Sequence, residues 1–164
     1  MSMISLFAYV GGLLEKYTPF RYPVKPYQEE VSKDLRRGSR VDKAGIVSLI
    51  GAGFGTIVDL CAEQMPDEKY QSGWPGIRFV HIPIIDSCPP TKEQANQFLD
   101  LFKDKQFLPA YVHCEAGQGR TGCMVALYRI WIQNWTVEDA LKDGARHKLV
   151  LKNQINFIRT FRRS

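Results

Sequence analysis

The chain has 164 residues, of which 45% are hydrophobic, and it contains no internal repeat or low-complexity tract. This size and composition suit one globular domain with a full hydrophobic core. The four cysteines have no paired spacing, which argues against a disulfide framework and favours a reducing cytoplasm. The net charge of +5 fits an anionic substrate, but it also fits a solvated surface without a partner. The three histidines are scattered without ligand spacing, so we predict neither a metal site nor another cofactor.

Residues 1–30 are expected to form a lead-in that packs on a single domain, which residues 31–164 form. Residues 4–14 are apolar but too short to span a bilayer, and neither a preceding basic residue nor a clear small-residue cleavage site accompanies them. A helix or strand packed on the domain is therefore favoured over an export signal, which stays open as the alternative. Three prolines in residues 17–26 predict an irregular segment.

Strand and helix patterns alternate along the rest of the chain. Apolar or alternating runs predict a short strand within 31–39 and strands at 56–61, 77–84 and 109–112. Helical patterns predict helices at 43–50, 91–102, 120–133, 136–144 and 153–161, with Asp42 as a cap and Thr91 and Gln94 at the spacing of a capping box. Loops are expected at 63–76 and 86–90. The alternation predicts an α/β sandwich with a central, mostly parallel sheet flanked by helices, and a ligand at the carboxyl ends of the strands.

The stretch that carries chemistry lies between the last predicted strand and the helix after it. It reads HCEAGQGRTG at residues 113–122, with five residues between Cys114 and Arg120. A loop that leaves a strand and enters a helix points successive backbone N–H groups inward, where they can hold a tetrahedral dianion. Arg120 can grip two oxygens of that dianion, and the same donors stabilise a thiolate, so we predict Cys114 as a nucleophile. The residues predicted to bind phosphate are Glu115, Ala116, Gly117, Gln118, Gly119 and Arg120.

The pattern His113-Cys114-x-x-Gly117-x-x-Arg120-Thr121 resembles the signature of the cysteine-based protein tyrosine phosphatase superfamily. The alternative, a buried structural cysteine beside a glycine turn, needs neither the arginine nor the glycines. The resemblance implies a dual-specificity phosphatase fold and hydrolysis of phosphate monoesters through a cysteinyl-phosphate intermediate. Thr121 can offer its hydroxyl to the departing sulfur, and His113 is expected to order the loop through hydrogen bonds from its ring.

The predicted loop at 86–90 supplies the candidate acid, because the alkoxide or phenoxide leaving group needs a proton in the transition state. Asp86 follows a predicted strand on a loop that Pro89 and Pro90 hold. This arrangement resembles the acid loop of the small dual-specificity phosphatases, in which an Asp stands before a pair of prolines. We predict that Asp86 is the general acid and then the base that activates the hydrolytic water. The alternative is an Asp that only makes a turn ahead of the helix.

Two further assignments come from the resemblance. Gln154 lies in the C-terminal stretch where relatives often keep a glutamine that helps to place the water. Residues 58–63, VDLCAE, are similar to a segment of tensin-type phosphoinositide phosphatases whose cysteine lies beneath the phosphate loop and can trap the oxidised nucleophile as a disulfide. Cys61 is therefore a candidate redox partner of Cys114, with a small buried core cysteine as the alternative.

The substrate is less narrowly indicated than the chemistry. The loop pattern CxAGxGRT is shared by tensin-type lipid phosphatases and tyrosine-phosphatase-like phytases. The lipid enzymes place lysines where this chain has Glu115 and Gln118, so the loop resembles the phytase type more closely. Basic residues at 36–43 and 142–163 could surround a pocket for a polyphosphorylated ring, or form a solvated helix face. We favour a myo-inositol polyphosphate, with phosphotyrosine and phosphoserine or phosphothreonine proteins as the alternative.

Two other classes of protein fit the sequence less well. A phosphate-binding module without catalysis would be expected to lack Cys114, Arg120 or Asp86, and all three are present. A sulfurtransferase or arsenate reductase also has a cysteine in an anion loop, but neither accounts for the Arg-Thr-Gly after it together with the acid loop before it. The expected partner is a phosphorylated small molecule or phosphoprotein, not nucleic acid or a membrane, and we expect a monomer.

Overall fold

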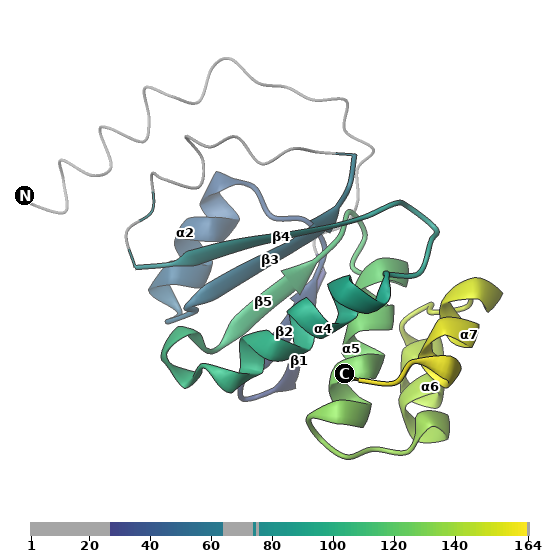
Figure 1. The fold of residues 1–164 in the computed structure, drawn as a ribbon. Helices are drawn as coiled ribbons and strands as arrows, with labels where there is room; N and C mark the ends of the chain where they lie inside the picture. The colour runs from purple at the N-terminus through teal and green to yellow at the C-terminus, as the bar shows by residue number, and fades with distance from the viewer. Residues whose placement is uncertain (1–26, 64–73, 75, 164) are drawn as a thin grey trace, which may run out of the picture.

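The computed structural model describes residues 27–63, 74 and 76–163. Its centre is a five-stranded sheet with the strand order β1-β2-β5-β3-β4 (Figure 1). The strands are β1 (Gln28–Ser32), β2 (Leu35–Gly38), β3 (Thr56–Cys61), β4 (Arg78–Ile84) and β5 (Ala110–His113). β2, β5, β3 and β4 pair in parallel, and β1 pairs antiparallel with β2 at one edge. The predicted α/β fold with a mostly parallel sheet is therefore confirmed.

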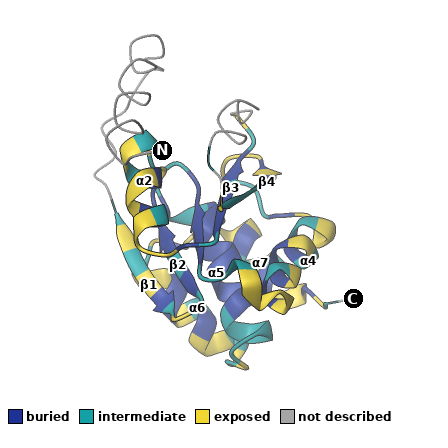
Figure 2. Cartoon of the chain, turned by 90° about the vertical axis from the view of Figure 1, so that its left-hand side faces the viewer, coloured by how far each residue is buried: buried dark blue, intermediate teal, exposed yellow. Residues whose placement is uncertain are grey.

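Helices cover both faces of the sheet (Figures 1 and 2). They are α2 (Lys43–Gly51) on one face and α4 (Lys92–Asp100), α5 (Gly119–Trp131), α6 (Val137–Arg146) and α7 (Lys152–Thr160) on the other, with short 3₁₀ turns at Leu101–Lys103 and Lys105–Phe107. The predicted caps are confirmed. The carboxylate of Asp42 accepts from the N–H of Gly45 at 2.9 Å, and Thr91 and Gln94 form a reciprocal capping box.

Two hydrophobic clusters hold the layers together. The smaller one joins α2 to the sheet and consists of Ile46, Leu49, Phe54, Ile57 and Tyr111. The larger one has α5 at its centre, and every residue of that helix from Arg120 to Tyr128 is buried (Figure 2). A helix that is apolar on nearly all sides is buried, and α5 has this character from Cys123 to Tyr128. Its packing fixes the helix N-terminus, which receives the loop carrying Cys114.

The region before β3 contains one strand more than the sequence pattern indicates. The range 31–39 holds β2 as predicted, but β1 precedes it, and a tight turn at residues 33–34 joins the two. That turn has neither glycine nor proline; the N–H of Asp34 donates to the Ser32 hydroxyl at 3.2 Å instead.

The expected lead-in and the alternative export signal fall on residues 1–26, outside the described residues, although β1 starts at Gln28 within the range assigned to the lead-in. Most of the predicted loop at 63–76 is also outside them. In the described part of the chain, no helix is long and apolar enough to cross a membrane.

Candidate active site

A cavity of about 890 Å³ opens at the carboxyl ends of β3, β4 and β5, which is where the sequence places the ligand. Its lining comes from the ends of these strands, from the loop between Cys114 and Arg120, which we call the phosphate loop, and from the start of α7. The lining residues are Ala62, Glu63, Ile85, Asp86, Ser87, Cys114, Glu115, Ala116, Gln118, Gly119, Arg120, Lys148, Leu151 and Gln154. Cys114 is almost completely buried at this cavity, with an exposed fraction of 3%.

The phosphate loop turns at Gly117, which has a φ angle of +71°. A Cβ atom there would lie 2.5 Å from the carbonyl carbon and oxygen of Gly38, so only glycine fits at this position. The carbonyl of Gly117 accepts a hydrogen bond from Nη2 of Arg37 at 2.8 Å. The end of β2 therefore supports the loop from the side opposite the cavity.

Arg37 is a functional candidate that the sequence pattern did not reveal. Expected among the basic residues of a pocket rim or solvated face, it is instead buried, with an exposed fraction of 1%. Burial lowers the pKa of its guanidinium, against the pull of the nearby Tyr27 and Glu29. Its Nε and Nη1 atoms have no hydrogen-bond partner among the described residues. The side chain acts as a fixed donor beneath the loop.

The guanidinium of Arg120 lies buried at the base of the cavity and is fully engaged at both Nη atoms. Nη1 and Nη2 donate to the two oxygens of Glu63 at 2.7 and 2.9 Å. Nη1 also donates to the carbonyl of Ile84 at 3.1 Å, and Nη2 lies 3.1 Å from Oδ1 of Asp86. Burial alone would lower the pKa of Arg120, but the hydrogen bonds to Glu63 raise it. The guanidinium of Arg120 therefore stays positively charged.

Glu63 is the second residue that the sequence did not single out. It follows β3 directly, and the Arg120 hydrogen bonds lower the pKa of its carboxyl. The only local signal is an acidic residue just past the carboxyl end of a core strand, and that signal is common. Asp86, by contrast, lies where it was predicted, on the loop after β4, with 74% of its side chain exposed. The structure thus brings both carboxylates to Arg120.

Two side chains at the start of α7 donate hydrogen bonds to the loop that follows β4 and carries Asp86. Nδ2 of Asn153 donates to the carbonyl of Ser87 at 2.8 Å, and Nε2 of Gln154 donates to the carbonyl of Cys88 at 3.1 Å. Gln154 is completely buried yet lines the cavity, and its Oε1 has no hydrogen-bond partner in the described part of the chain. That oxygen is available to accept a hydrogen bond from a water molecule, as its predicted role requires.

Three predicted residues are buried and do not line the cavity. The Thr121 hydroxyl is buried and has no partner among the described residues, so a hydrogen bond to the Cys114 sulfur is not present in this state. Nδ1 of His113 also lacks a hydrogen bond there and lies 3.9 Å from Asp59. Cys61 is completely buried, and burial raises the pKa of its thiol, which keeps its proton. All four cysteines are unpaired.

The predicted basic rim is present only in part. Of the basic residues at 142–163 that the structure describes, Lys148 lines the cavity. Arg146 instead pairs with Asp143 at 3.0 Å, and Arg163 pairs with Asp100 at 3.0 Å. Neither of these two arginines lines the cavity.

Residues 23–159 match the family model PTP-NADK, described as a DSP-PTPase phosphatase fused to NAD+ kinase. The chain belongs to this family. This is the class of phosphatase domain that the loop signature resembles. NAD kinase 2, chloroplastic, of Arabidopsis thaliana is 35% identical over 112 residues, which are 65% of this chain and 11% of the relative. Inositol diphosphatase DSP3 of the same plant is 29% identical over 122 residues, 65% of this chain and 55% of the relative.

The chain therefore spans a small part of the length of the kinase relative and about half of the length of the diphosphatase. Among solved structures, the catalytic core of the PP-IP phosphatase Siw14 from S. cerevisiae has a TM-score of 0.69 at 19% identity, covering 82% of this chain and 85% of that one. TpbA of P. aeruginosa has a TM-score of 0.64 at 20% identity, covering 78% and 80%. These likenesses confirm the dual-specificity phosphatase fold.

Proposed function

We propose that this phosphatase removes phosphate groups from myo-inositol polyphosphates, diphosphorylated ones included, through a phosphorylated Cys114. The observation that carries the proposal is the placement of Cys114 and Arg120 in a cavity of about 890 Å³. A cavity of this size accommodates a ring with several phosphate groups. The need for a reduced Cys114 favours a reducing compartment such as the cytoplasm.

Binding of the phosphoryl group first requires a rearrangement at Arg120, because both of its Nη atoms are engaged. Asp86 contacts Arg120 only at Nη2 and is mostly exposed, whereas Glu63 holds both Nη atoms. The phosphoryl group therefore displaces Asp86, and Glu63 keeps the guanidinium in place. Displacement also frees the Asp86 carboxyl to face the leaving group at the rim of the cavity.

The reaction then proceeds in two steps, phosphoryl transfer to Cys114 and hydrolysis of the cysteinyl-phosphate. The Cys114 thiolate attacks phosphorus, the bond from phosphorus to the leaving oxygen breaks, and protonated Asp86 gives its proton to that oxygen. Water next attacks the cysteinyl-phosphate, Asp86 takes a proton from it, and the sulfur leaves as thiolate with release of phosphate. Oε1 of Gln154 accepts a hydrogen bond from this water, and Thr121 turns its hydroxyl toward the departing sulfur.

The relatives support an inositol substrate. Two Arabidopsis relatives are named inositol diphosphatases, and Siw14 is named a PP-IP phosphatase. Lys148 on the cavity wall adds a positive charge for a second phosphate group. Within this proposal, the substrate ring lies between Lys148 and the phosphate loop.

A phosphoprotein substrate is the second candidate, and the chemistry of the rim favours it. The carboxylates of Glu63, Asp86 and Glu115 line the cavity beside Ile85 and Leu151, which are exposed at 68% and 38%. Acidic and apolar groups of this kind suit a peptide with basic or apolar residues next to the phosphorylated one. TpbA is named a dual specificity protein phosphatase and has been solved with phosphotyrosine.

A comparison of kcat/KM for inositol hexakisphosphate, a diphosphoinositol phosphate and phosphotyrosine peptides tests the proposal. We expect the inositol substrates to be preferred. Lys148→Met should raise KM for them several-fold with little change in kcat, because Lys148 binds without touching the transferred group. Lys152→Met is the matched control, since Lys152 is exposed and does not line the cavity. A preference for phosphopeptides, or equal effects of the two substitutions, would contradict the inositol assignment.

A further inference from the structure

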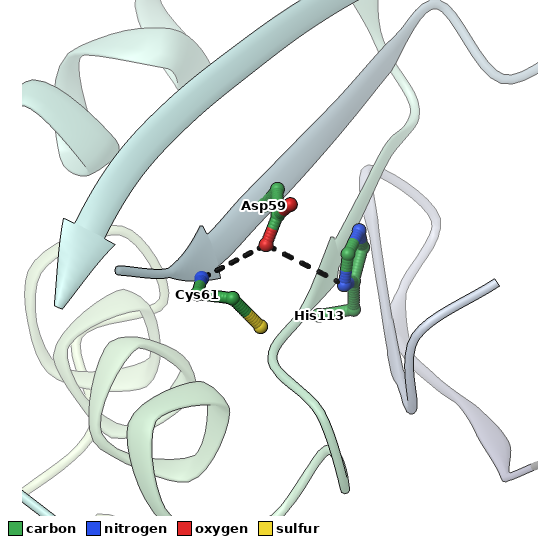
Figure 3. Close-up of side chains that lie close together, drawn as sticks. All are labelled: Asp59, Cys61 and His113. Atoms are coloured by element: carbon green, nitrogen blue, oxygen red, sulfur yellow. Dashed lines mark hydrogen bonds and ion pairs between the residues drawn. The ribbon is translucent and has the colours of Figure 1, made fainter. Parts of the chain in front are cut away.

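A second group of chemically active side chains lies outside the cavity, at the carboxyl ends of β3 and β5 (Figure 3). Asp59 on β3 and His113 on β5 are register partners in neighbouring parallel strands, and Cys61 follows on β3. A carboxylate oxygen of Asp59, Sγ of Cys61 and a ring nitrogen of His113 all lie within 4.8 Å of one another. The sequence hides this juxtaposition, because it depends on the pairing of β3 with β5.

Two features set this group apart from an ordinary polar contact. His113 is almost completely buried, yet its Nδ1, turned toward Asp59, has no hydrogen-bond partner among the described residues. A buried nitrogen without a partner is costly unless something binds it. Asp59 Oδ1 accepts the N–H of Cys61 at 2.8 Å, and this bond fixes the carboxylate beside the thiol.

The three side chains supply the donor atoms that zinc prefers, namely a thiolate, an imidazole nitrogen and a carboxylate oxygen. In a tetrahedral zinc site, the ligand atoms lie roughly 3.3–3.6 Å apart, as follows from bond lengths of about 2.0–2.3 Å. Asp59 and His113 are at 3.9 Å, and the whole group is within 4.8 Å. Changes in the side-chain torsion angles of these residues would bring the ligand atoms to such separations.

We propose that Asp59, Cys61 and His113 bind Zn²⁺ and that the bound ion inhibits the phosphatase. Asp59 is 21% exposed at its side chain and offers the ion a way in, whereas Cys61 and His113 are buried. Binding releases the Cys61 proton to solvent and leaves the fourth coordination position for water or for the Cys114 thiolate. The ion would lie close to both catalytic charges, because its ligand His113 directly precedes Cys114 and its ligand Cys61 is the register partner of Ile84, whose carbonyl accepts from Arg120. It would attract the nucleophilic thiolate and repel the arginine.

Cobalt binding tests the site without reference to catalysis. The metal-free, reduced 164-residue chain carrying Cys114→Ser is titrated with Co²⁺, and the near-ultraviolet thiolate-to-cobalt absorption is recorded. We expect the absorption to persist in this background, to be lost with added Cys61→Ser, and to be displaced by Zn²⁺. Asp59→Asn should weaken Co²⁺ binding roughly tenfold or more, since the amide keeps the hydrogen bond but is a poor ligand. Cys88→Ser is the matched control, a half-buried thiol outside the group, and should bind Co²⁺ as the parent does.

Inhibition links the site to catalysis in a separate measurement. Zn²⁺ should inhibit hydrolysis of p-nitrophenyl phosphate by the otherwise unchanged protein, EDTA should reverse the inhibition, and Asp59→Asn should need roughly tenfold more Zn²⁺ or more. Absence of the cobalt absorption would overturn the site. Absorption that is lost in Cys114→Ser but kept in Cys61→Ser would instead make the nucleophile the metal ligand. Equal zinc sensitivity of Asp59→Asn and the unchanged protein would overturn the inhibitory role.

Discussion

Replacement of Glu63 by glutamine perturbs the active site most selectively, because this carboxylate holds both Nη atoms of Arg120 at 2.7 and 2.9 Å. Glutamine keeps one acceptor oxygen, but its NH₂ group cannot face the second guanidinium nitrogen. A hydrogen bond between charged groups contributes about 1.5–3 kcal/mol, and the 42% exposure of Glu63 reduces this to about 1–2 kcal/mol. Arg120 would then be less well oriented for the phosphoryl group. We expect kcat/KM for p-nitrophenyl phosphate to fall roughly 5- to 30-fold.

Steady-state kinetics compare kcat/KM of Glu63→Gln with that of the unchanged protein, and urea unfolding compares their free energies of unfolding. Glu138→Gln is the matched control, because Glu138 is exposed on α6, does not line the cavity and should leave kcat/KM nearly unchanged. The lowered pKa of Glu63 means that its contribution to stability is complete above the ordinary glutamate range, near pH 4.3, and is lost as the pH falls through the lowered value. The stability difference between the proteins should therefore disappear in acid. An equal kcat/KM in Glu63→Gln would refute the reasoning. A higher kcat/KM would also refute it and would show that Glu63 competes with the substrate for Arg120.

Cys114→Ser should abolish turnover of p-nitrophenyl phosphate while the fold and the affinity for phosphate persist, and activity near that of the unchanged protein would exclude Cys114 as the nucleophile. Asp86→Asn should lower the rate ~10²–10⁴-fold for esters with poor leaving groups and much less for activated ones; equal effects on both would assign the proton to another group. Mild peroxide should join Cys61 to Cys114 in a disulfide that peptide mapping detects, and Cys61→Ser should make inactivation irreversible by thiol. A Cys88–Cys114 link, or unchanged recovery in Cys61→Ser, would leave Cys61 as a core residue only.

The features that the sequence predicted are those with local causes. The capping box at Thr91 and the β-branched run that forms β3 depend on residues close together in the chain, and both lie where they were expected. The phosphate loop is also continuous, so the spacing of Cys114 and Arg120 was sufficient to locate the cavity. Asp86 could be placed at the rim because it follows a core strand that ends at the same edge of the sheet.

The features that the sequence missed depend on strand register. Arg36 and Arg37 are adjacent and look alike in the sequence. In the structure, Arg36 lies over the ring of Phe54, whereas Arg37 is buried and reaches Gly117, 80 residues away. Only the pairing of β2 with β5 decides which of the two supports the loop. Glu63 and Asp59 were missed for the same reason, since the residues that they face come from β5 and α5, far away in the chain.

Trapping of the covalent intermediate tests the central claim most directly. Asp86→Asn slows the step in which water must be activated, so the cysteinyl-phosphate should accumulate with an activated substrate such as ³²P-labelled p-nitrophenyl phosphate. Rapid quenching and peptide mapping should then place the label on Cys114, and Cys114→Ser should carry none. A label on another residue, or substrate turnover without any labelled protein, would contradict the proposed mechanism.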